Sequence, residues 1–167
     1  MQALLECSGG NLVVPGLILN DRVDGGHLVV NPPREVWERS ELTPGELKAW
    51  SFLVAATGRA MLDVLPQLEG GCLNYWEAGN WALNDAAPPA GPKDVKQCRR
   101  VHLHVFGRSR NPRGSDWRWG ESPRFPDYIG SREWAAKHAP IDERERAKVA
   151  RRVAEILSTR YDMESRS

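Results

Sequence analysis

The sequence predicts an α+β fold, in which an antiparallel sheet packs with a long helix and a C-terminal helix. Three observations lead to this prediction. Apolar and polar residues alternate over residues 97–107, as in a half-buried strand. Two short apolar segments flank a turn within residues 16–32. Two later segments combine helix-capping residues with apolar residues at helical spacing. Strands, a helix, further strands and a last helix in this order favour an antiparallel sheet.

The composition is that of a single globular domain spanning residues 1–167, with 41% apolar and 27% charged residues. Disorder over the whole length and a coiled coil are therefore not expected. No apolar run approaches the ~20 residues that span a bilayer, and residues 1–10 do not resemble a signal peptide. The three cysteines are scattered without a CxxC motif. We therefore expect a cytoplasmic protein with no membrane partner.

The first element is a predicted hairpin over residues 16–32. Its arms are Leu17–Leu19 and His27–Val30, and the turn residues lie between Asn20 and Gly26. The Asn-Asp and Asp-Gly-Gly sequences in this turn are typical of chain reversals.

Two helices follow from their capping residues. Thr43 is the expected N-cap of the first helix, with Glu46 as its capping-box partner, and this helix should end near Pro66. The C-terminal helix is predicted over residues 141–161, where Asp142 and Glu145 form a second capping box. The tail beyond this helix is expected to fray.

The remaining segments divide into strands and loops. Residues 72–84 are rich in aromatic residues and could hold one or two strands, broken near Gly79. Residues 85–94 are a loop, residues 97–107 a strand and residues 109–140 an irregular segment. We expect the core of the domain within about residues 11–108.

Charge is distributed unequally along the chain. Residues 1–90 hold 5 Lys and Arg against 11 Asp and Glu, whereas residues 91–167 hold 18 against 11. The basic half is therefore the place to look for an anionic ligand. The 11 acidic residues of this half leave no continuous basic stripe, so a nucleic-acid partner is not expected.

The most informative segment is the predicted strand at residues 97–107. In a strand, Arg100, His102 and His104 share one face at intervals of about 7 Å. Two imidazoles and a guanidinium together suit a phosphate, and a neutral imidazole can attack phosphorus. A strand with polar side chains in solvent explains the same pattern. So does a zinc site, which would need Cys98, His27 or Asp85 as a third ligand.

Residues 101–108, VHLHVFGR, resemble the signature strand of the histidine triad (HIT) superfamily of nucleotide hydrolases and transferases, His-x-His-x-His followed by two apolar residues. Three further segments, in the family's order, are similar: the hairpin ending in residues 26–32, the helix start at residues 40–44, and Asn84 ahead of a Gly/Pro-rich loop. The resemblance covers about residues 16–108. It implies a HIT-like fold that often forms homodimers.

The resemblance also implies a mechanism. His102 would attack the α-phosphate of a nucleotide anhydride, ester or amidate, and water would hydrolyse the nucleotidyl-histidine. The Arg100 carbonyl could fix the reactive tautomer of His102. His104 would contact the phosphate and assist the leaving group. Neither a metal nor a cofactor is required.

The first triad position departs from the family, because Arg100 stands there. Its charge could hold a phosphate oxygen and keep His102 unprotonated, or the site could have become a non-catalytic nucleotide-binding module. Gln97 is the nearest match to the family's phosphate-contacting Ser/Thr.

Three further residues match binding positions of the family. Asn20, or Asp21 if the register differs by one, would contact the ribose, although both residues are also common in turns. His27 would support the histidine strand from behind, or serve as a half-buried structural histidine. Asn84 would contact the phosphate or the histidine strand, or cap its own loop.

The irregular segment lies beyond this resemblance. Arg108, Arg110 and Arg113 could reach distal phosphates, and its aromatic residues Trp117, Trp119 and Phe125 could stack on a second base. Alternatively, the aromatic residues pin the loop to the surface.

Overall fold

The structure is a computed structural model that describes residues 3–166. Its centre is a six-stranded sheet in the order β4-β5-β3-β2-β1-β6, and all neighbouring strands are antiparallel. The strands are β1 (Ala3–Cys7), β2 (Gly10–Val13), β3 (His27–Asn31), β4 (Cys72–Ala78), β5 (His102–Arg108) and β6 (Ser165–Arg166). The predicted α+β class with an antiparallel sheet is confirmed.

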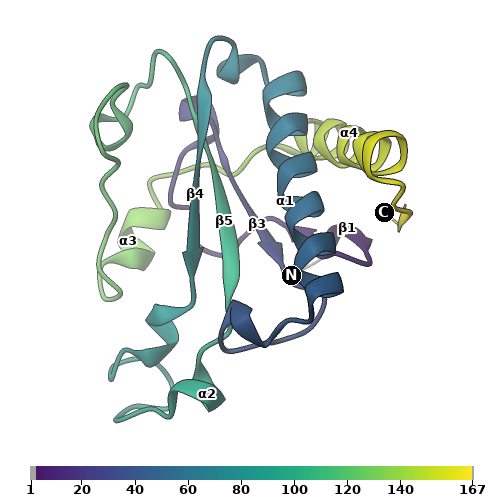
Figure 1. The fold of residues 1–167 in the computed structure, drawn as a ribbon. Coiled ribbons are helices and arrows are strands. Elements are labelled where there is room, and N and C mark those ends of the chain that lie inside the picture. Colours follow the sequence, from purple (N-terminus) through teal and green to yellow (C-terminus); the bar gives the residue numbers. More distant parts are fainter. Residues whose placement is uncertain (1–2, 167) are drawn as a thin grey trace.

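Within residues 3–166, four α-helices lie on the two faces and at one end of this sheet, which divides the molecule into layers (Figure 1). The helices are α1 (Pro44–Val64), α2 (Val95–Cys98), α3 (Ser131–Ala135) and α4 (Glu143–Tyr161). Helix α1 covers one face of the sheet, and α4 packs beside it. Residues 109–130 and α3 lie on the opposite side of β4 and β5.

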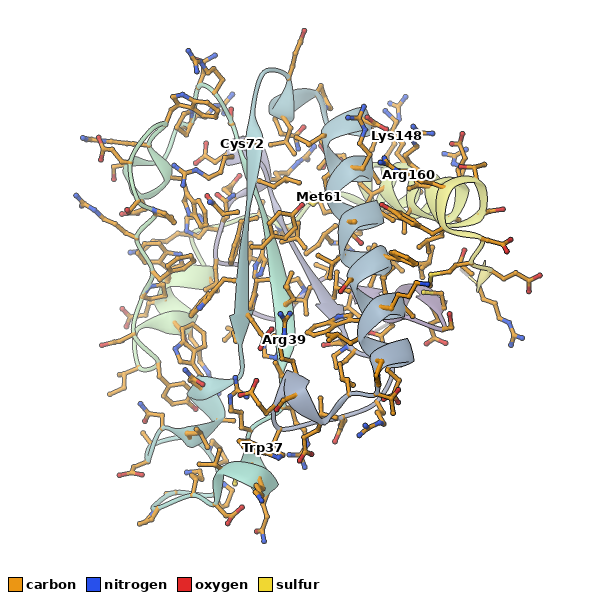
Figure 2. All side chains as sticks on the ribbon, in the orientation of Figure 1. Trp37, Arg39, Met61, Cys72, Lys148 and Arg160 are labelled. Carbon is orange, nitrogen blue, oxygen red and sulfur yellow. The ribbon has the colours of Figure 1, made fainter. Side chains whose placement is uncertain are left out.

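Helix α1 begins and ends where the local sequence predicts. The Thr43 side chain accepts a hydrogen bond from the Glu46 N–H, and the Glu46 carboxylate accepts one from the Thr43 N–H. The helix ends at Val64, ahead of Pro66. Its inner residues, such as the fully buried Met61, fill the layer between α1 and the strands (Figure 2).

Helix α4 has the second predicted capping box, between Asp142 and Glu145. Its buried stripe is the predicted one: Val149, Val153, Ile156 and Leu157. Lys148 and Arg160 lie on its exposed surface. The main hydrophobic core includes this stripe, and it also includes Leu5 from β1. The expectation of a frayed tail is wrong, because Ser165–Arg166 pairs with β1.

The predicted hairpin is half correct. His27–Asn31 is a strand, but its partner is Gly10–Val13, and Leu17–Leu19 has no regular structure. The apolar residues at 18 and 19 are nevertheless buried, at 7% and 1% exposure. A short apolar run reports burial, and burial does not require strand pairing.

The histidine strand is shorter than predicted, because β5 begins at His102 rather than Gln97. Residues 95–98 form α2. Asp94 caps its start, and the Asp94 side chain accepts a hydrogen bond from the Gln97 N–H. Upstream, residues 72–84 hold one strand, β4, which ends before Gly79. Gly79 has φ 140°, a conformation that favours glycine.

Candidate active site

Strand β5 lies between β3 and β4 and presents His102, His104 and Phe106 on the face away from α1. Leu103 and Val105 point into the core beneath α1. The predicted alternation of faces is therefore present from His102 onward. Because β5 is held on both edges, its side chains have a fixed register: Trp76 pairs with His104, and Ala78 pairs with His102.

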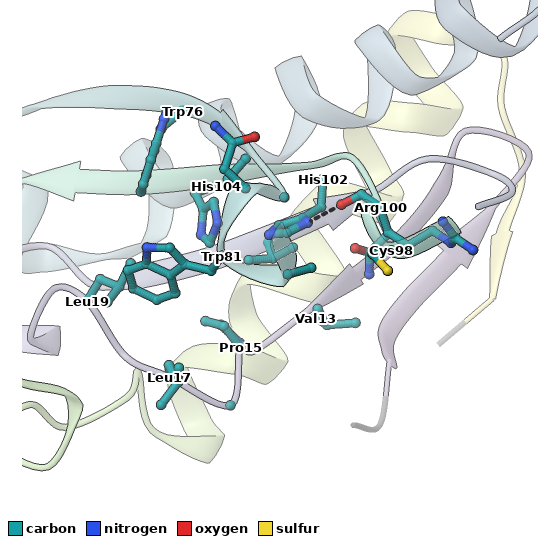
Figure 3. A pocket seen from close by; sticks show the side chains of 17 residues that line it. Val13, Pro15, Leu17, Leu19, Trp76, Trp81, Cys98, Arg100, His102 and His104 are labelled. Atoms are coloured by element: carbon teal, nitrogen blue, oxygen red, sulfur yellow. Dashed lines mark hydrogen bonds between the residues drawn. The ribbon is translucent and has the colours of Figure 1, made fainter. Parts of the chain in front are cut away.

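The side chains of His102 and His104 line a cleft of about 740 Å³ (Figure 3). Its walls come from β2, from the irregular chain that follows β2, from β3, and from β4 with the turn after it. Nine of the 17 lining residues are apolar, namely Val13, Pro15, Leu17, Leu19, Val29, Trp76, Ala78, Trp81 and Ala82. A cleft of this kind can surround a flat organic group whose phosphate reaches the histidines.

The tautomer of His102 is set by the main chain. Its Nδ1 lies 3.0 Å from the Arg100 carbonyl oxygen, which can only accept, so Nδ1 carries the proton. Nε2 then has a free lone pair, and Figure 3 shows this nitrogen turned away from the carbonyl. Burial is the main cause of the lowered pKa of His102, so the ring is neutral at pH 7. A neutral imidazole with a free Nε2 can act as a nucleophile.

The tautomer of His104 is set through His27. The Leu19 N–H donates to His27 Nδ1 at 3.2 Å, so the proton of neutral His27 is on Nε2. His27 Nε2 lies 2.7 Å from His104 Nδ1 and donates to it. Neutral His104 therefore carries its proton on Nε2. Its free N–H suits an anionic oxygen.

Burial keeps both of these rings neutral. His27 is 0% exposed and His104 is 8% exposed. Burial, followed by the nearby histidines, lowers the pKa of His104 to about 3 and that of His27 well below its usual range. The three rings thus offer a phosphate one lone pair and one N–H donor.

Aromatic rings surround His104 on the cleft face. The Trp76 ring stacks on it with centroids 5.5 Å apart, and Phe125 packs against Trp76 at 4.8 Å. Phe106 stacks on His27 at 4.4 Å. The sequence pointed to aromatic residues in both segments. It could not show that Trp76 faces His104, because that depends on the pairing of β4 with β5.

Arg100 lies at the edge of the cleft but does not extend the row of histidines. It precedes β5, and its guanidinium binds the Glu35 carboxylate at 3.0 Å and the carbonyl oxygens of Lys96 and Arg99. Figure 3 shows this side chain running away from both imidazoles. The predicted row ends at His102 because the strand begins there.

The predicted ribose contacts are used within the protein itself. Asn20 is 0% exposed, and its Nδ2 donates to the carbonyl oxygens of Gly107 and Gly26 at 2.8 and 3.3 Å. Asp21 accepts from the N–H groups of Val23 and Ala139. Neither residue lines the cleft. Each side chain is occupied by hydrogen bonds to main-chain groups of the protein.

The two other predicted contacts also lie outside the cleft. The Asn84 side chain accepts from the Ala86 N–H at 2.9 Å, which is the loop-capping alternative. Gln97 is exposed on α2. The helical turn at residues 95–98 directs it away from the path that a strand would have given it.

The irregular segment is fixed to the sheet by buried polar contacts. Arg108 is 5% exposed and donates to Asn74 Oδ1 and to the carbonyl oxygens of Arg118 and Glu121. Trp117 is 1% exposed. These two residues favour the alternative in which the segment is pinned, and Arg108 is not available for a distal phosphate.

Two further features concern metals and membranes. Within residues 3–166, no three His, Cys, Asp or Glu side chains are grouped as metal ligands, and His104 Nδ1 already faces His27. Among the helices of the same residues, none has the length and apolar character needed to cross a bilayer.

No protein-family model matches the chain, and no curated protein matches it significantly.

Proposed function

We propose that the protein is a nucleotide hydrolase or nucleotidyl transferase of the histidine triad type. It would act at the α-phosphate of a nucleotide anhydride, ester or amidate. The observation that carries this proposal is the pair of complementary tautomers in one cleft: a free Nε2 lone pair on His102 and a free Nε2–H on His104. The apolar walls beside them suit a nucleobase.

The first step is nucleophilic substitution at phosphorus. The Nε2 lone pair of His102 forms the N–P bond, and the leaving group departs with the electron pair of its own bond to phosphorus. The Nδ1–H of His102 keeps its hydrogen bond to the Arg100 carbonyl oxygen, and this bond stabilises the positive charge of the ring. His104 Nε2–H donates to an oxygen on the phosphorus, where negative charge develops.

The second step releases the nucleotide. Water attacks phosphorus, the N–P bond breaks, and its electron pair returns to His102 Nε2. One proton of the water is taken up by the leaving group, which departed with a negative charge. The products are a nucleoside monophosphate and the protonated leaving group. An acceptor other than water would make the reaction a transfer.

The intact mass of the protein tests this mechanism directly. We expect a nucleotide-sized adduct after brief exposure to diadenosine polyphosphates, adenosine phosphoramidates or a nucleotide sugar, with matching release of monophosphate. His102→Ala should form no adduct. His102→Gly supplied with free imidazole should recover turnover without an adduct, because the added imidazole replaces the missing nucleophile. An adduct on His102→Ala would place the nucleophile elsewhere and contradict the mechanism.

A non-catalytic nucleotide-binding module is the second candidate. Arg100 favours it, because this residue replaces the first histidine of the triad and its guanidinium is bound to Glu35. Nucleotide binding without an adduct or monophosphate from any of the substrates would support this module.

A further inference from the structure

Two tryptophans from residues 109–140, Trp117 and Trp134 of α3, donate to one main-chain oxygen beside the cleft. Trp117 Nε1 lies 3.2 Å and Trp134 Nε1 3.1 Å from the Leu19 carbonyl oxygen. Trp117 is almost fully buried, and Trp134 is half-buried. Trp117 is separated from Leu19 by 98 positions in the sequence, and Trp134 by 115.

Leu19 lies in a stretch without regular structure, so no sheet ladder holds its main chain. Its carbonyl receives the two indoles, and its N–H donates to His27 Nδ1 at 3.2 Å. The next residue, Asn20, adds the bond from Nδ2 to the Gly107 carbonyl. These hydrogen bonds fix the main chain of Leu19, and with it the position of the Leu19 N–H, although the residue lies in a loop.

We propose that Trp117 and Trp134 are positioning residues for the histidine network. Their indole N–H groups hold Leu19 where its amide fixes the tautomer of His27, and His27 in turn fixes the tautomer of His104. The effect on tautomers is independent of the proposed function, whereas the effect on turnover rests on it.

The physical reason is a choice between two tautomers of a neutral imidazole. If the Leu19 N–H moves away, His27 Nδ1 loses its donor and can carry the proton itself. His27 Nε2 then accepts, and His104 must place its proton on Nδ1. His104 Nε2 would then present a lone pair toward the phosphate instead of an N–H. This exchange replaces an attractive contact with a repulsive one.

The test removes the indole N–H of Trp134 in two ways. The first variant is Trp134→Phe, and the second carries β-(3-benzothienyl)alanine at position 134, where sulfur replaces the N–H in a ring of the same shape. Trp119→Phe is the matched control. Trp119 lies in the same segment, stacks on Arg110, and has no hydrogen bond from its indole among residues 3–166.

The primary measurement is the ¹⁵N NMR spectrum of the imidazoles, which distinguishes protonated from unprotonated ring nitrogens. In the native protein, we expect single tautomers with the proton on Nε2 of His27 and of His104. Both position-134 variants should show mixed tautomers at these two histidines, and His102 should keep its proton on Nδ1. Adduct formation should slow by roughly tenfold, less than the 10²–10³ typical of deleting an oxyanion donor outright. Trp119→Phe should match the native protein in both measurements.

Unchanged tautomers in the folded position-134 variants would overturn the proposal, even if their activity fell, because that loss would then come from general loosening of the segment. Mixed tautomers together with a native protein that never forms an adduct would uphold the positioning role and reject the proposed function.

Discussion

Hydrogen-bond partners at single residues decide the chemistry of this cleft. The Arg100 carbonyl can only accept and the Leu19 N–H can only donate, so they assign opposite tautomers to His102 and His104. Both partners belong to the main chain. The orientation of both ring nitrogens is therefore set by the path of the backbone, and the side chain at position 100 takes no part in it.

Replacement of Arg100 tests this division between main chain and side chain. Arg100→Ala keeps the carbonyl and removes only the contacts to Glu35, Lys96 and Arg99. We expect adduct formation to change by less than about threefold, since an exposed ion pair contributes little. Glu35→Ala should behave alike, because it breaks the same pair. A loss of a hundredfold or more in Arg100→Ala alone would show that the guanidinium reaches the phosphate. The measurement is the rate of adduct formation by rapid-quench mass spectrometry.

Among the secondary-structure elements, β5 depends on a close approach of two glycines. A Cβ atom at Gly107 would overlap the main chain of Gly25, and one at Gly25 would overlap the main chain of Gly107. Gly25 also has φ 130°, a backbone conformation that residues other than glycine rarely adopt. This contact brings the chain at residues 20–26 against β5, where Asn20 bonds to the Gly107 carbonyl.

We expect Gly107→Ala to lower the free energy of unfolding by about 2–4 kcal/mol, because backbone must shift to admit the methyl group. Gly45→Ala is the matched control. Position 45 lies in the first turn of α1 with open space around it, so alanine there should be neutral or stabilising by up to about 1 kcal/mol. Urea denaturation followed by circular dichroism measures both. Equal stability of the two variants would contradict the close contact.

For the whole molecule, two neutral buried histidines make stability depend on pH. In the unfolded chain, His27 and His104 titrate near 6.5. In the folded protein, burial lowers both pKa values, to about 3 for His104. Below pH 6.5 the unfolded state therefore binds protons that the folded state does not. The contribution of the two neutral histidines to the free energy of unfolding is therefore complete above pH 6.5. It is lost as the pH falls from 6.5 toward the lowered pKa values of the folded protein.

We expect the free energy of unfolding to fall between pH 7 and pH 5, by up to about 1.4 kcal/mol per pH unit for each histidine. His104→Phe should be less stable at pH 7, since His27 loses its partner, but should show a smaller fall. Urea denaturation at the two pH values gives both quantities. Carboxylates such as Glu46, with a pKa lowered to about 2, make their contribution below this window. The same fall in both proteins would contradict the neutral state of His104.

The sequence by itself determined the local structure of this protein. Both long helices begin at capping boxes whose members are three residues apart, so no distant contact is needed to place them. The two faces of β5 follow from the alternation of side chains in a strand. The placement of His102 and His104 on one face therefore follows from residues that are neighbours in the chain.

Only the tertiary structure decided which groups meet in the cleft. His27 and His104 are 77 residues apart, and Trp134 and Leu19 are 115 apart. The turn at residues 95–98 removed Arg100 from the row of histidines, and burial turned Asn20 inward. Capping and alternation depend on neighbours in sequence. Contacts between distant segments depend on how the sheet pairs and which side chains the core admits, and neither appears in a local pattern.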